Sequence, residues 1–144
     1  MKRIAFTLLF GLLVLGGSAF AQVDCNAGLS GCLFDLPTGG TAPAITFTML
    51  ADAVVHIDAG IWASPGCSGD PDATAVGDLS LPAGPMTVYI NFTDPIPDGT
   101  PLSMIWTMGD CAATACIDYV MGSSPDRCPA GASEPATLDA TLPL

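Results

Sequence analysis

The chain has 144 residues, of which three are Lys or Arg and 14 are Asp or Glu, so its formal charge is -11 at neutral pH. A field of this sign repels phosphate backbones and anionic lipid, which excludes nucleic-acid binding and electrostatic membrane binding. Thirteen of the 14 acids are Asp, which favours turns, and the shortage of Glu and Lys argues against surface helices.

Residues 1–21 are typical of a secretory signal peptide. Lys2 and Arg3 form a positive start, residues 4–15 form an apolar run, and Ala19-Phe20-Ala21 is a cleavage motif. The apolar run is shorter than the about 20 residues that a membrane-spanning helix needs, and no later segment compensates. We therefore expect a secreted protein, extracellular or periplasmic, that begins after this segment and has no membrane span.

The remaining residues, 22–144, are expected to form one domain, because their number falls within the usual domain size. Removal of the signal peptide leaves Arg127 as the only cation against 14 carboxylates, a formal charge of -13. The simplest interpretation of this charge is a solvated surface without a specific function. The sharper one is binding of a divalent cation or of a partner with a basic or hydroxyl-rich surface.

Six cysteines in an exported chain predict three disulfides. They are Cys25, Cys32, Cys67, Cys111, Cys116 and Cys128. We expect local closure of Cys25 with Cys32 and of Cys111 with Cys116, which leaves Cys67 with Cys128 as a longer link. Metal ligation is the weaker alternative, since the sequence has no CxxC motif and its lone histidine, His56, is far from every cysteine.

Seven segments alternate between apolar and polar residues after an irregular stretch at residues 22–41, and alternation is the period of a strand with one buried face. In chain order they are residues 45–49, 53–62, 79–81, 86–93, 102–108, 115–121 and 138–142. In the longest, every odd position from Ala53 to Ile61 is apolar, so this face is predicted to point inward. No segment keeps a helical period. The sequence therefore predicts an all-β fold, an antiparallel β-sandwich of jelly-roll or Ig-like type with about seven strands, stabilised by disulfides.

Between residues 44 and 108, several short motifs follow one another in a recognisable order. They are Ile45-Thr46-Phe47-Thr48, Ala51-Asp52-Ala53-Val54-Val55-His56-Ile57, Cys67-Ser68-Gly69-Asp70, Leu81-Pro82-Ala83-Gly84-Pro85-Met86-Thr87-Val88-Tyr89-Ile90, and the strand at 102–108. In this order they resemble the bacterial pre-peptidase C-terminal domain, a small jelly-roll-like sandwich attached to secreted peptidases and other exported proteins. The resemblance implies a role in binding, targeting or stabilising secreted proteins, calcium in some members, and no catalysis by the domain itself.

A calcium site is one hypothesis for the acidic segment at residues 69–78. Asp70, Asp72 and Asp78 place three hard oxygen ligands within nine residues, and Asp52 or loop carbonyls could complete the shell. The segment is not an EF-hand, because it lacks the central Gly and the Glu at position 12. The alternative is a set of ordinary acidic turns in an acidic protein. No other cofactor is predicted.

A ligand surface is a second hypothesis, since His56, Asp58 and Trp62 share one face of the long strand. Such a set could stack on a sugar or hold a peptide. We favour the structural alternative, in which Trp62 covers the disulfide of Cys67 and His56 is half-buried and bonded to Asp58 or to the backbone. Trp106 lies on an apolar face and is expected in the core.

Catalysis is not predicted. The chain has one histidine, and neither a G-x-S-x-G elbow nor an H-E-x-x-H helix appears. A carboxylate pair for glycoside hydrolysis would meet only in space, so spacing does not test it, but one small domain leaves little room for a cleft.

Two non-enzymatic functions remain. The first is a binding or accessory module that recognises an extracellular protein or polysaccharide. The second is a structural subunit that binds copies of itself, with the terminal segment at residues 136–142 added to a neighbour's sheet. A third interpretation, a secreted inhibitor, would need an exposed rigid loop, for which Pro95-Ile96-Pro97-Asp98 is the candidate.

Overall fold

The computed structural model describes residues 22–27, 29–129 and 135–143, and every regular element in these ranges is a β-strand. The strands are β1 (Ser30–Asp35), β2 (Thr41–Met49), β3 (Ala53–Trp62), β4 (Ala73–Leu81), β5 (Gly84–Phe92), β6 (Pro101–Met108), β7 (Ile117–Val120) and β8 (Ala136–Ala140). Within these same ranges, no helix has the length and apolar character that crossing a membrane requires. The predicted signal peptide lies outside the described residues.

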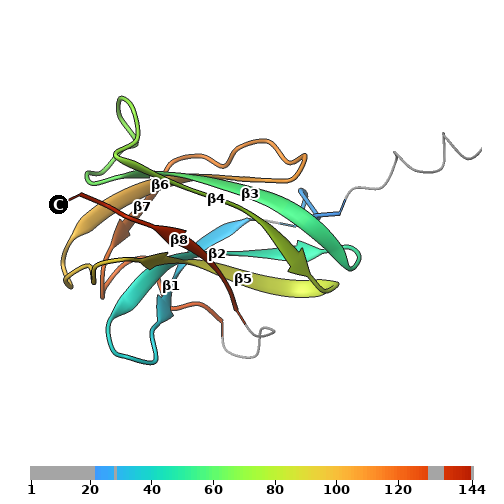
Figure 1. Cartoon of the computed structure of the whole chain (residues 1–144), viewed down its shortest axis with the longest axis horizontal. Helices are drawn as coiled ribbons and strands as arrows, with labels where there is room; N and C mark the ends of the chain where they lie inside the picture. Colours follow the sequence, from blue (N-terminus) through green and yellow to red (C-terminus); the bar gives the residue numbers. More distant parts are fainter. Residues whose placement is uncertain (1–21, 28, 130–134, 144) are drawn as a thin grey trace, which may run out of the picture.

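The strands form two four-stranded sheets that pack face to face (Figure 1). Sheet A has the order β1-β2-β5-β8 and sheet B has the order β4-β3-β6-β7. The described pairs are antiparallel except for β5 with β8, which is parallel. The all-β sandwich predicted from the alternating segments is therefore confirmed, with eight strands in place of about seven.

Strand β3 has the inward face that its sequence predicts. Val55, Ile57, Ala59 and Ile61 are at most 1% exposed, whereas Val54, His56 and Asp58 between them face solvent. Beside them on the same face of sheet B lie Trp106, Met104 and Met108 of the neighbouring strand β6, all fully buried. Burial of these apolar side chains supplies most of the driving force for folding.

Two strand predictions were wrong. Strand β1 lies in a stretch expected to be irregular, because its apolar signal was only Leu33 and Phe34. Strand β4 begins at Ala73 rather than at Leu79, since its inward positions are the small residues Ala73, Ala75 and Gly77, which hydropathy does not mark as a core face. As a result, Asp78 lies within a strand and not in a loop.

The predicted disulfide pairing was also wrong, although all six cysteines are bonded as expected. The bonds join Cys25 with Cys111, Cys32 with Cys128, and Cys67 with Cys116. Cys25 follows a residue that bonds to Thr48 at one end of β2, whereas Cys32 pairs in register with Ala44. At 3.4 Å per residue these places are about 14 Å apart, which is too far for a disulfide. Three disulfides indicate folding in an oxidising compartment.

A buried polar contact joins the two sheets. Tyr119 of β7 donates a hydrogen bond to the carbonyl of Ala44 in β2 (2.8 Å) and accepts one from the indole Nε1 of Trp106 in β6 (3.2 Å). Room for it comes from Gly31, where a Cβ would lie 2.9 Å from the Tyr119 hydroxyl and 2.7 Å from Ile117. Burial raises the pKa of Tyr119 above its ordinary value, while the hydrogen bond from Trp106 acts in the opposite direction.

Candidate binding surface

The connection between β3 and β4, residues 63–72, extends away from the sandwich and is called the β3–β4 loop here (Figure 1). All of its residues except Ala63 and Cys67 are exposed. Its sequence, ASPGCSGDPD, contains only small or acidic residues and prolines. Exposed loops on a rigid scaffold are the usual carriers of binding function, so this loop is the first place to look for a site.

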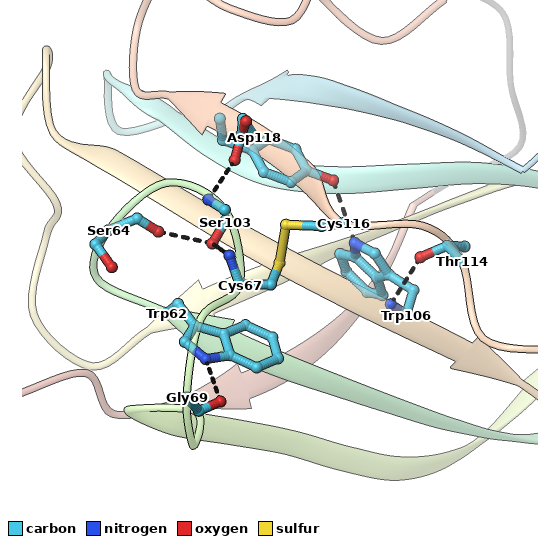
Figure 2. Close-up of a disulfide and its surroundings, with 11 residues drawn as sticks. Trp62, Ser64, Cys67, Gly69, Ser103, Trp106, Thr114, Cys116 and Asp118 are labelled. Carbon is cyan, nitrogen blue, oxygen red and sulfur yellow. Dashed lines mark hydrogen bonds between the residues drawn. A yellow bond between two sulfur atoms is a disulfide. The ribbon is translucent and has the colours of Figure 1, made fainter.

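Side chains from two other strands hold the middle of the β3–β4 loop. Ser103 of β6 is fully buried; its hydroxyl donates to the carbonyl of Ser64 (2.6 Å) and accepts from the amide of Cys67 (2.9 Å). Asp118 of β7 accepts from the amide of Gly66 (2.9 Å). Figure 2 shows these contacts beside the disulfide that ties Cys67 to Cys116. The loop is therefore fixed to β6 and β7 as well as to its own hairpin.

The two ends of the loop are also closed. The carboxylate of Asp72 accepts from the amide of Ala63 (2.7 Å), and the amide of Asp72 donates to the carbonyl of Ile61 (2.8 Å). The indole of Trp62 donates to the carbonyl of Gly69 (3.0 Å; Figure 2). An exposed segment with so many fixed amides and carbonyls has few conformations open to it.

Trp62 supports the loop from below and is only 7% exposed. Its ring lies over Gly60, where a Cβ would be 3.0 Å from the ring and 3.8 Å from Pro71. Because Gly60 lies two residues earlier on the same face and has no side chain, the ring of Trp62 can lie flat against the strand. Of the three residues predicted to form a ligand surface, only His56 and Asp58 are thus open to solvent.

The expectation that His56 is half-buried and bonded to Asp58 or to the backbone was wrong. His56 is exposed, and its Nδ1 lies 2.8 Å from Oδ1 of Asp78, its partner in register on β4. Asp58 lies between Val76 of β4 and Thr107 of β6 on the same outer face of sheet B. Exposed pairs of this kind contribute little to stability, so the fold does not depend on them and their side chains can contact a ligand.

The three aspartates of the calcium hypothesis have different environments. Asp70 is exposed on the β3–β4 loop, Asp72 caps the amide of Ala63, and Asp78 faces His56 from within a strand. In the described ranges, no group of three or more His, Cys, Asp or Glu side chains is arranged to hold a metal ion. Calcium binding stays a prediction from the sequence.

Ser103 and Asp118, which brace the loop, were not predicted from the sequence. They lie 36 and 52 residues from the amides that they bind, and a lone Ser or Asp within a strand gives no signal at that distance.

Comparison with known proteins adds no relative: no family model, no curated protein and no solved structure matches the chain.

Proposed function

We propose that this protein is a secreted, non-catalytic binding module and that it recognises an extracellular protein or polysaccharide through the β3–β4 loop and the adjacent outer face of sheet B. The observation that carries the proposal is the bracing of an exposed loop by Ser103, Asp118, Trp62 and a disulfide. A loop fixed before binding loses little conformational entropy when it binds, which improves affinity without additional contacts.

Charge narrows the class of partner. The loop and its bracing strand carry Asp70, Asp72 and Asp118, and the one cation beyond residue 3, Arg127, is held instead by Asp35 of β1 at 2.9 Å. A surface of exposed carboxylates and carbonyls favours a partner with basic or hydroxyl-rich groups. Secretion is supported by the signal-like residues 1–21 and by the disulfides, and the resemblance to pre-peptidase C-terminal domains supports an accessory role.

The test compares two variants that each lose one hydroxyl. Ser103→Ala removes two of the hydrogen bonds that hold the loop but leaves every exposed loop residue unchanged. Thr46→Ala removes a longer hydrogen bond on sheet A, 3.2 Å to the carbonyl of Ser30. Binding of each protein to a panel of neutral and cationic polysaccharides and basic secreted proteins is measured by biolayer interferometry. We expect Ser103→Ala to weaken binding about tenfold, because two buried hydrogen bonds to the loop are lost, and Thr46→Ala to leave binding unchanged.

Two results would overturn the proposal. One is equal affinity of Ser103→Ala and wild-type protein, because the bracing would then serve stability alone. The other is wild-type protein that binds no member of the panel.

A further inference from the structure

Among the strands that the structure describes, only β8 lies outside every disulfide-closed part of the chain. The last bonded cysteine is Cys128, and β8 begins eight residues later at Ala136. The other seven strands lie between Cys25 and Cys128, so the disulfides tie them together. Strand β8 can therefore leave its sheet without breaking a covalent bond.

The same strand covers the side of the sandwich that is formed by β5 and β4. It pairs in parallel with β5 of sheet A and packs against β4, the edge of sheet B (Figure 1). Leu138, Ala140 and Leu142 are each at most 6% exposed, so this segment contributes core side chains. Loss of the strand would leave an apolar groove between β4 and β5, and exposed apolar surface of this kind is costly in water.

The groove is shaped for this segment in particular. Gly77 of β4 makes the recess for Leu138, since a Cβ at position 77 would lie 2.8 Å from Cδ2 of the leucine. Asn91 donates to Asp139 (2.9 Å), and the amide of Thr93 donates to the carbonyl of Ala140 (2.9 Å). The occupant that satisfies all of these contacts in register is the same segment from a second copy of this chain.

The link between Cys128 and β8 is long enough for an exchange. Residues 129–135 supply seven residues, and an extended chain spans at most about 25 Å over that number. This reach exceeds the separation of neighbouring strands, about 4.8 Å, and of packed sheets, about 10 Å. A strand that is released from its own sheet can therefore enter the groove of an adjoining molecule.

We propose that β8 is exchanged between copies of this protein, so that each molecule's groove holds the C-terminal strand of another. Exchange replaces every contact that β8 makes in the closed monomer with an identical contact from the partner. The equilibrium between closed monomers and exchanged assemblies therefore depends on protein concentration. The proposal does not depend on the proposed binding function. Together the two would give assemblies that present several β3–β4 loops to one ligand.

The experiment mixes two full-length secreted chains of different mass, one with Asn91→Cys and one with Asp139→Cys. Positions 91 and 139 are partners in register, so a strand exchanged between chains holds the two new thiols side by side. The chains are unfolded in urea with native disulfides intact, refolded together at low and at high concentration, and oxidised mildly. We expect a disulfide-linked heterodimer that increases with concentration and outnumbers both homodimers.

Leucine and threonine variants of the strand separate exchange from surface collision. Leu138→Ala in both chains removes the packing of the leucine against Gly77, so β8 leaves its sheet more easily. The rate of heterodimer formation from folded monomers should then rise on the order of tenfold or more. Thr137→Ala, at an exposed position of the same strand, should leave the rate unchanged. The proposal is overturned by the absence of heterodimer after joint refolding, or by equal rates for both variants and the parent pair.

Discussion

Replacement of Tyr119 by Phe tests the packing of the two sheets, because it removes one hydroxyl and no carbon. That hydroxyl bonds at 3.2 Å to the indole of Trp106 and at 2.8 Å to the carbonyl of Ala44, and all three residues are fully buried. Phe keeps the apolar contacts of the ring. The variant therefore reports the polar contact between β2, β6 and β7 alone.

The expected cost follows from the groups that are left without a partner. The buried indole N–H of Trp106 loses its acceptor, which costs about 1–3 kcal/mol. The carbonyl of Ala44 loses a donor but lies in a strand ladder, so its loss is smaller, and the absent hydroxyl no longer needs to be desolvated. We expect a net destabilisation of about 2–3 kcal/mol, which for a domain of this size lowers the melting temperature by about 10 °C.

Urea unfolding followed by tryptophan fluorescence measures the free energy of unfolding of the wild type and the variant. The matched control is Tyr89→Phe. Tyr89 is half-buried on the outer face of sheet A, where its ring stacks on Phe34 with centroids 4.4 Å apart, and Phe keeps that stack. We expect the control to cost less than about 0.5 kcal/mol. Equal costs for the two variants would refute the buried contact between the sheets.

Three further predictions concern pH, disulfides and calcium. Burial raises the pKa of Tyr119, so the neutral phenol contributes its full stabilisation below the ordinary tyrosine pKa of about 10. Above that pH the free energy of unfolding should fall by up to about 1.4 kcal/mol per pH unit, and Tyr119→Phe should lack this loss. Replacement of Cys25 and Cys111 by Ala should lower the free energy of unfolding by about 2–5 kcal/mol, since the bond closes a long loop, and an unchanged urea midpoint would contradict this. Because Asp72 and Asp78 already bind protein groups, neither calcium nor a chelator should move the melting temperature; a rise with calcium would instead support the site predicted from the sequence.

The sequence predicts the fold class because alternation is a local property. The inward face of β3 could be read directly, since Val55, Ile57, Ala59 and Ile61 are large or apolar enough to mark it. The face of β4 could not be read, because Gly77 leaves space for Leu138 from the other sheet, and a residue that makes room carries no hydropathy signal.

Pairing over long distances is where sequence reasoning stops. The choice of near cysteines as partners failed because strand β1 carries Cys32 away from Cys25, and only the register with β2 determines that direction. The parallel pairing of β8 and the hydrogen bonds of Ser103 depend in the same way on which strands become neighbours. For the candidate surface, the sequence placed His56, Asp58 and Trp62 on one face of a strand and favoured a structural role for Trp62, but it could not show that the loop buries the ring of Trp62 and that Asp78 is the partner of His56.

The rigidity of the β3–β4 loop is measured most directly by ¹⁵N relaxation of its backbone amides. The amides of Gly66 and Cys67 donate to Asp118 and Ser103, and Cys67 is also tied to Cys116. Their order parameters should be about 0.85, equal to those of the flanking strands β3 and β4. Values below about 0.6 at these two amides would show a flexible loop and contradict its role as a preformed binding surface.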